Sequence, residues 1–188
     1  MATGGPVAGL VLAAGAGTRY GQPKAPVVVE GERLVDRAVR VLTAAGCEPV
    51  LVVLGAWVGR VDGADVFVND AWPEGMGSSL RAGLAHLRDT TDSGSVVVTL
   101  VDLPGLTEQA VRRVLDAQPE APVAQAAYEG ERGHPVRLAR ALWDDVIAVA
   151  RGDEGARAVL RARDDVVMVE VGDVATGRDM DVPEGTTD

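Results

Sequence analysis

The sequence predicts an α/β protein, built as a three-layer α/β/α domain around a mostly parallel sheet. Apolar runs of strand length alternate with segments of helical periodicity along the chain. Several of these runs are continuously apolar, which is typical of strands that are buried on both faces. A chain of 188 residues can also bury a sizeable core. Because no repeat or long linker divides it, we expect one domain over residues 1–188.

The expected strands are short apolar runs that stop at polar or glycine-containing loops. Their bounds are residues 7–14, 49–55, 64–69, 95–102, 122–128 and 165–171. In an open, mostly parallel sheet, ligands bind beyond the carboxyl ends of the strands. A ligand is therefore expected at the loops that follow residues 13, 54, 68 and 101.

The expected helices lie between these strands and carry apolar residues at helical spacing. They cover residues 31–46, 78–88, 107–118, 138–151 and 154–163. A serine after the glycine-rich stretch "EGMG" is available as the N-cap of the second helix, and Thr107 as that of the third. Gly46 is a natural end for the first, and Trp143 is interpreted as helix packing.

Charge and cysteine content restrict the class of protein. The net charge of −10 argues against a duplex nucleic acid as partner, because such binding requires broad neutralisation of phosphates. The single cysteine, Cys47, is interpreted as a small buried apolar residue and fits a reducing cytoplasm. No signal segment or membrane span is apparent, so we expect a cytoplasmic protein that does not bind membranes.

The loop after the first strand, in "LVLAAGAGTRYGQPKAP", is the strongest local signal. Its glycines at 15, 17 and 21 do not have the spacing of a dinucleotide-binding or Walker loop. A glycine-rich turn still lets backbone N–H groups approach an anion, and Arg19 and Lys24 add positive charge. The alternative is an ordinary tight turn with two solvated cations. Lys24 is the only lysine beside seventeen arginines, which suggests that this position needs a compact ammonium.

Four segments carry a resemblance to a known family. Residues 12–24, "LAAGAGTRYGQPK", resemble a nucleotide-loop signature of cytidylyl- and guanylyltransferases, and residues 69–84, 101–105 and 133–160 resemble further elements in the same order. The chain is thus similar to the molybdopterin nucleotidyltransferase family, and within it most to the molybdenum cofactor cytidylyltransferases. The resemblance implies a Rossmann-like, glycosyltransferase-A-like nucleotidyltransferase domain with a mostly parallel mixed sheet.

The resemblance also implies an activity and a set of site residues. The activity is Mg²⁺-dependent transfer of a nucleoside monophosphate, CMP from CTP on the evidence of Ala13-Ala14-Gly15, to a phosphorylated acceptor such as molybdopterin, with release of pyrophosphate. Lys24, Arg19 and Asp102 would be catalytic. The nucleotide would be bound by Leu12, Ala13, Ala14, Gly15, Ala16, Gly17, Asn69, Gly77, Ser78 and Ser79.

Two carboxylates are implied as metal ligands. Asp102 ends a strand in "VDLPG", and its alternative role is to cap a turn or helix. The second is Asp181 in "RDMDVPEG", although Val182 and Gly185 depart from the family pattern there. Asp179 is an alternative ligand. A further alternative is that both carboxylates of this loop are merely solvated and bind no metal.

Several functional alternatives remain open at this level. His134 is a proton carrier, a structural residue or an acceptor contact, and Arg157 is an acceptor contact or a surface cation. The base could instead be guanine or the acceptor another phosphorylated metabolite, and the domain could bind nucleotides without catalysis. An NAD-dependent oxidoreductase is disfavoured by the glycine spacing and by the lack of an acidic residue after the second strand. A molybdoenzyme or its maturation factor is the macromolecular partner implied by the resemblance.

Overall fold

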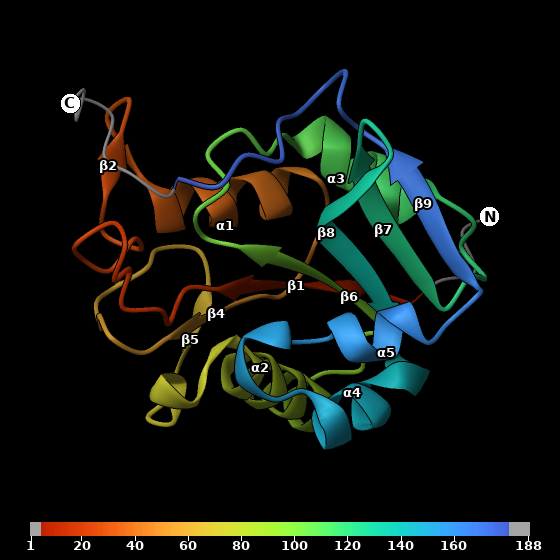
Figure 1. Ribbon diagram of the computed structural model, residues 1–188, viewed down its shortest axis with the longest axis horizontal. Coiled ribbons are helices and arrows are strands. Elements are labelled where there is room, and N and C mark those ends of the chain that lie inside the picture. The colour runs from red at the N-terminus through yellow and green to blue at the C-terminus, as the bar shows by residue number, and fades with distance from the viewer. Residues whose placement is uncertain (1–4, 181–188) are drawn as a thin grey trace.

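The computed structural model describes residues 5–180, apart from the side chains at positions 154 and 158, and its layers follow the order helix, sheet, helix (Figure 1). Over these residues a seven-stranded sheet has the order β5-β4-β1-β6-β8-β7-β9. The strands are β1 (Val7–Leu12), β4 (Val50–Leu54), β5 (Asp65–Val68), β6 (Ser95–Leu100), β7 (Val123–Tyr128), β8 (Glu131–Ala139) and β9 (Val166–Glu170). The predicted α/β class with a mostly parallel mixed sheet is confirmed.

The parallel half of the sheet determines where the loops meet. β1 lies between β4 and β6 and pairs in parallel with both, and β5 pairs in parallel with β4. β8 runs antiparallel to β6 and to β7, while β9 is again parallel to β7. The carboxyl ends of β1, β4, β5 and β6 therefore lie at one edge of the sheet, as parallel strands require.

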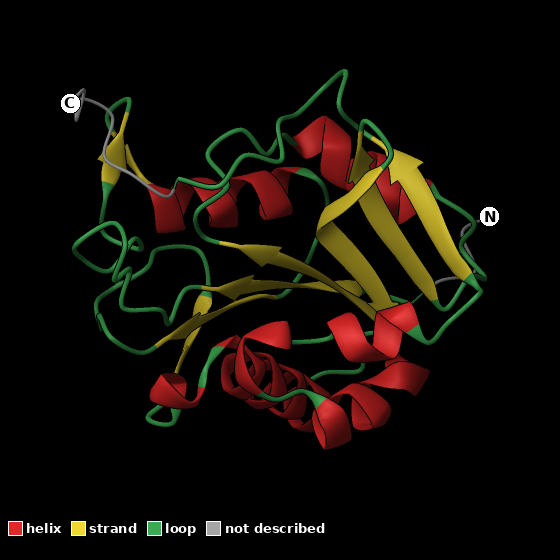
Figure 2. Cartoon of the chain, in the orientation of Figure 1, coloured by secondary structure: helices red, strands yellow, loops and turns green. Residues whose placement is uncertain are grey.

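Helices cover both faces of the sheet (Figure 2). Apolar side chains of α1 (Leu34–Ala44) and α3 (Glu108–Asp116) form one core cluster with the sheet, and those of α2 (Met76–Thr90) and α4 (Trp143–Val149) form the other. The second cluster also contains Leu160 of α5 (Arg157–Arg161). Short 3₁₀ helices lie at η1 (Trp72–Glu74), η2 (Arg140–Leu142) and η3 (Gly152–Glu154). Trp143 is fully buried, in agreement with its predicted packing role.

The sequence did not reveal the antiparallel part of the fold. Residues 131–139 form β8, whereas the prediction began a helix at residue 138 that in fact starts at Trp143. The last predicted helix is shortened to residues 157–161. The first helix begins at Leu34 because β3 (Glu32–Arg33) pairs with β2 (Val28–Val29) in a small hairpin.

The two predicted N-caps have different outcomes. The hydroxyl of Thr107 accepts a hydrogen bond from the amide of Ala110, which confirms this cap. The serine cap of α2 is wrong, because Gly75 is the N-cap and no side chain caps this helix. Gly75 has φ +102°, a conformation that glycine adopts without strain and that lets the chain enter the helix sharply.

Arginine side chains bind backbone carbonyls at helix ends. Arg137, which is 5% exposed, donates to the carbonyl oxygens of Leu115 and Gln118, each at 2.8 Å, just after α3. Arg140 donates to those of Arg88 and Thr91 at 2.7 and 2.9 Å, at the end of α2. The last carbonyls of a helix lack intrahelical partners, so a guanidinium that reaches two of them stabilises the end.

Two further sequence expectations concern the core and the membrane. Cys47 is 2% exposed, and burial raises the pKa of its thiol to about 12, so it is a buried neutral side chain as predicted. Within residues 5–180, none of the helices combines the length and the apolar character needed to cross a membrane.

Candidate active site

Backbone hydrogen bonds extend the parallel strands into the loops and bring the loops together. The amide of Ala13 donates to the carbonyl oxygen of Val53, and the amide of Val101 donates to that of Leu12. On the other side of β4, the amide of Asn69 donates to Leu54. The segments after β1, β5 and β6 are thereby fixed side by side at one edge of the sheet.

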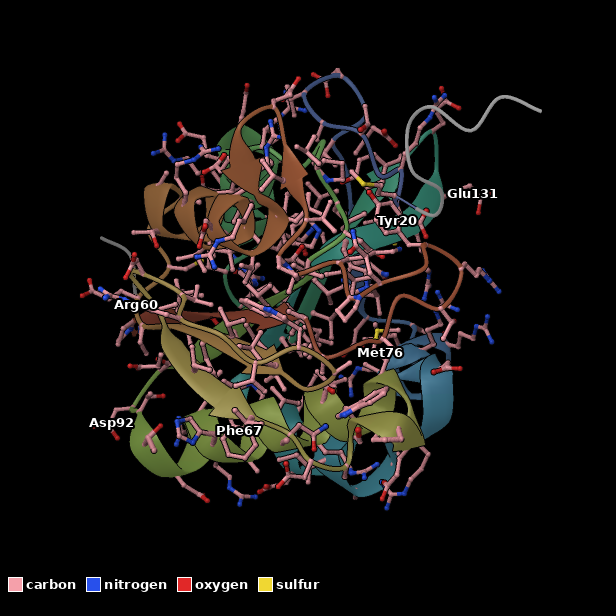
Figure 3. The ribbon with its side chains drawn as sticks, turned by 90° about the vertical axis from the view of Figure 1, so that its left-hand side faces the viewer. Tyr20, Arg60, Phe67, Met76, Asp92 and Glu131 are labelled. Atoms are coloured by element: carbon pink, nitrogen blue, oxygen red, sulfur yellow. The ribbon has the colours of Figure 1, made fainter. Side chains whose placement is uncertain are left out.

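These segments line a cavity of about 660 Å³. Figure 3 shows Tyr20, from the loop after β1, above Met76, at the start of α2; both residues line this cavity. The loop after β4 does not line it, and its Gly55 instead packs against the side chain of Trp72. The lining residues are Leu12, Ala13, Ala14, Gly15, Ala16, Gly17, Thr18, Arg19, Tyr20, Lys24, Trp72, Pro73, Gly75, Met76, Ser79, Leu100, Val101, Asp102, Asp153 and Arg157.

The glycine loop after β1 has a conformation that side chains would disrupt. Gly17 has φ +60°, and a Cβ there would overlap the carbonyl oxygen of Gln22. A Cβ at Gly15 would meet no atom within 4 Å, so this position opens onto the cavity. The loop thus closes tightly on itself at Gly17 and exposes backbone at Gly15. This is the arrangement in which main-chain N–H groups can approach an anion.

Lys24 and Asp102 form an ion pair in the cavity. Lys24 Nζ donates to Asp102 Oδ2 at 2.7 Å, and the two side chains are 12% and 20% exposed. Backbone hydrogen bonds hold the chain next to Lys24, because the amide of Val35 in α1 donates to the carbonyl oxygen of Ala25. The predicted lysine and aspartate therefore lie in contact although 78 residues separate them.

The residues present fit a divalent cation at Asp102. Its Oδ1 is buried and has no hydrogen-bond partner among the residues that the structure describes. Burial of a carboxylate oxygen without a hydrogen-bond partner costs free energy. Such an oxygen is a suitable ligand for a hard divalent cation. The other predicted ligand, Asp181, lies outside the described residues. The adjacent residue Met180 does contact Asp102: its amide donates to the backbone carbonyl oxygen of Asp102 at 3.0 Å.

The predicted residues at the start of α2 differ in their surroundings. Ser79 lines the cavity, whereas Asn69, Gly77 and Ser78 are buried and do not line it. The amide nitrogen of Asn69 donates to the hydroxyls of Ser78 and Ser79 at 2.9 and 3.1 Å. Besides its predicted role at the nucleotide, Asn69 thus anchors the start of α2.

The segment from Ala150 to Asp153 packs against the same helix start. A Cβ at Gly77 would lie 2.7–2.9 Å from backbone atoms of Arg151, and a Cβ at Gly75 would lie 2.6 Å from the carbonyl carbon of Gly152. Arg81 of α2 donates to the Ala150 carbonyl oxygen at 2.7 Å. These glycines therefore permit close approach of the segment that brings Asp153 and Arg157 to the cavity.

His134 lies near this site but is not one of the described residues that line the cavity. Its Nδ1 is 3.4 Å from the carbonyl oxygen of Val98. Burial lowers the pKa of the imidazole from its ordinary 6.5, and the positive charge of Arg157 lowers the pKa further. The neutral form is thus favoured, which makes His134 a poor permanent cation for binding an anion.

Sequence reasoning missed Tyr20, Trp72, Met76 and Asp153 as residues of the cavity. Tyr20, Trp72 and Met76 lie inside quoted motif segments, but nothing in residue type distinguished them from core or surface positions. For Trp72 a signal existed in Gly55, because a glycine directly after a buried strand often marks the close approach of another group.

A family model described as a MobA-like NTP transferase domain matches residues 9–166 of this chain. The chain belongs to this NTP transferase family. The match includes the glycine loop, Lys24, Asp102 and the start of α2, so the cavity of this NTP transferase consists of family segments. As a member, it is a nucleotidyltransferase that acts on nucleotide substrates.

Individual relatives of this NTP transferase have diverse names. It is 36% identical over 195 residues to the nicotine blue oxidoreductase of Paenarthrobacter nicotinovorans, over 95% of this chain and 93% of that protein. It is 37% identical over 103 residues to a probable molybdenum cofactor guanylyltransferase of Opitutus terrae, over 53% of this chain and 50% of that protein. The structure of Rv0371c from Mycobacterium tuberculosis in complex with manganese matches with a TM-score of 0.74 and 25% identity, over 93% and 94% of the two chains.

Proposed function

We propose that this nucleotidyltransferase transfers CMP from CTP to a phosphorylated acceptor such as molybdopterin and releases pyrophosphate. The observation that carries the proposal is the Lys24–Asp102 pair in a cavity lined by a glycine loop. In one place it joins a compact cation, exposed backbone, and an aspartate whose Oδ1 has no partner within residues 5–180. These are the parts that transfer at a phosphorus atom uses, because such chemistry depends on positioning and charge neutralisation.

Each cavity residue has a role in this reaction. An oxygen of the acceptor phosphate attacks the α-phosphorus of the nucleotide, and the bond to the β-phosphate breaks so that pyrophosphate leaves. The backbone N–H groups of residues 15–17 hold the triphosphate, and Arg19 balances the charge of the leaving pyrophosphate. Lys24 donates to an oxygen of the α-phosphate, where negative charge increases in the transition state.

The assignments of the metal and of the acceptor substrate are supported by different observations. Asp102, with Asp181 as the second predicted ligand, would hold Mg²⁺, which neutralises charge on phosphate oxygens when bound. The manganese complex of Rv0371c supports a divalent cation in this fold. Molybdopterin as acceptor is supported by the name of the Opitutus terrae relative, and it implies a molybdenum enzyme as the recipient of the product.

Cytosine as the base rests on Ala13 and Ala14, which the cytidylyltransferase signature shares and which line the cavity. Their small side chains leave room beside the glycine loop. GTP is the alternative substrate, and the name of the Opitutus terrae relative favours it. Thermal shift with CTP, GTP, ATP or UTP, each with Mg²⁺, separates these bases. The proposal expects the largest stabilisation with CTP.

The test of catalysis is the Lys24→Ala variant. We expect its turnover to fall by a factor on the order of 10²–10³, because one electrostatic contact to the reacting phosphate is lost. Pyrophosphate release is measured with CTP and a phosphorylated pterin. The matched control is Arg60→Ala, which removes a cation that is 87% exposed and keeps full turnover. A Lys24→Ala protein with near wild-type turnover would refute the role of Lys24.

A second candidate is an oxidoreductase, and the 36% identity with nicotine blue oxidoreductase favours it. In that case the glycine loop would hold the pyrophosphate of a dinucleotide cofactor. Against it, the loop lacks the dinucleotide glycine spacing, and β4 is followed by Gly55 rather than by an acidic residue. Stabilisation by NAD or NADP, in the absence of stabilisation by any nucleoside triphosphate, would place this candidate first.

A further inference from the structure

The ion pair between Lys24 and Asp102 uses the same carboxylate that fits a metal. The ammonium is 2.7 Å from Oδ2, while Oδ1 is buried without a partner among the described residues. Both side chains are at least 80% buried, so water and salt screen this pair less than they screen a surface pair. In this structure Lys24 is therefore a counter-ion of Asp102.

A divalent cation that approached Asp102 would meet this ammonium at close range. The free Oδ1 and the occupied Oδ2 belong to one carboxylate, so the two cations would lie only a few ångströms apart. At such distances, and in a site that is only partly solvated, the repulsion between the two positive charges strongly weakens metal binding. The ammonium beside Oδ2 therefore disfavours a divalent cation at Oδ1.

We propose that Lys24 restricts metal binding to the nucleotide-bound state, in addition to its role at the phosphate. This inference rests on the proposed function. Without nucleotide, Lys24 neutralises Asp102 and disfavours the metal. A bound triphosphate brings several negative charges beside the loop that carries Lys24 and offers the ammonium a new acceptor. Lys24 then leaves Asp102, and the carboxylate becomes available to the metal.

The residue type at position 24 suits such an exchange. A lysine ammonium is a compact charge on a flexible stem with three rotatable donors, whereas a guanidinium forms a rigid fork. Arg137 and Arg140, by contrast, each bind backbone carbonyls at helix ends. The group that must change partners is the chain's one lysine.

The experiment titrates Mn²⁺ into the protein and follows free Mn²⁺ by electron paramagnetic resonance, with and without CTP. In Lys24→Met, the apolar stem remains and the charge is absent. We expect its Mn²⁺ affinity without nucleotide to exceed the wild-type affinity by at least about tenfold, because the repulsion is removed. The matched control, Arg60→Met, removes a cation that is 87% exposed and outside the cavity, and leaves this affinity within about twofold of wild type.

Two further measurements use the melting temperature of Lys24→Met, which is defined even where this variant is less stable than the wild type. Its melting temperature rises on addition of Mn²⁺ more than that of the wild type, since the metal replaces the missing counter-ion. In the double variant Lys24→Met, Asp102→Asn, both gains disappear because the carboxylate is gone. Together these results would support the inference.

The contrary results separate the inference from the proposed function. If the wild type binds Mn²⁺ with CTP but Lys24→Met without nucleotide binds it no more tightly than the wild type, the inference is refuted and the function stands. If the nucleotide-free wild type binds Mn²⁺ as tightly as the CTP-bound protein, the inference is also refuted. If neither CTP nor GTP promotes metal binding in any variant, both fail.

Discussion

Gly77 provides a quantitative test of the contact between α2 and the segment from Ala150 to Asp153. A Cβ there would lie 2.7, 2.8 and 2.9 Å from the amide nitrogen, carbonyl carbon and Cα of Arg151. Ordinary contacts between carbon atoms begin near 3.5 Å, so Gly77→Ala requires a displacement of roughly half an ångström. The obstacle is backbone, which cannot rotate away as the end of a side chain can.

The expected cost follows from these distances. Overpacking of this kind destabilises a protein by about 1–3 kcal/mol. Alanine also favours a helix over glycine by about 0.5–1 kcal/mol, which offsets part of that cost. Taking the middle of both ranges, we expect a net loss of about 1 kcal/mol, which for a chain of this length corresponds to a fall in melting temperature of about 2–4 °C. Because Asp153 lies in the displaced segment and Arg157 follows it, turnover falls too, while CTP still binds.

The measurement compares melting curves of the wild type, Gly77→Ala and Gly94→Ala. Gly94 is the matched control, because a Cβ there has its nearest neighbours at 3.6 and 3.8 Å, which is ordinary contact. Gly94→Ala should change the unfolding free energy by less than about 0.5 kcal/mol. A Gly77→Ala protein that melts at or above the wild-type temperature would refute the close packing described for residues 151–153.

Two further predictions concern pH and thiol chemistry. The pKa of His134 is below 6.5 in the folded protein, so the stability that neutral His134 provides is present above pH 6.5 and is lost as the pH falls below it. Chemical denaturation of wild type and His134→Gln between pH 7 and 5 should show a smaller decline in the variant, and equal declines would contradict the shift. Because burial raises the pKa of Cys47 to about 12, iodoacetamide at pH 8 should alkylate the native protein far more slowly than the urea-unfolded protein, and equal rates would contradict its burial.

The parallel half of the fold was predictable because each of its strands carries its own signal. β1 and β4 are continuous apolar runs that are largely buried, and β6 differs from such a run only at Ser95 and Thr99. β8 lacked such a signal. Its first half contains Gly133, His134 and Pro135, and the apolar residues after it were interpreted as one longer helix. Its strand conformation depends on pairing with β6 and β7, which local sequence does not encode.

The candidate site was predictable where the chemistry lies in the residue type. Gly15, Gly17, Lys24 and Asp102 line the cavity, as the motifs indicated, although their roles stay predictions. The supporting contacts were not predictable, because they join distant segments. The hydroxyl of Ser78 donates to the carbonyl oxygens of Ala71 and Gly75 instead of capping the helix, and only the folded chain reveals this.

The contrast between many arginines and one lysine has a practical consequence. Apart from the α-amino group, Lys24 carries the only primary amine of the chain, and that amine lies in the cavity. An acylating reagent selective for amines therefore has one side-chain target, whatever its dose. After digestion, the mass of the peptide that contains Lys24 would then report the occupancy of this one position. Protection by a nucleotide could be followed directly in the mass spectrum, without a label, a substrate assay or knowledge of the acceptor.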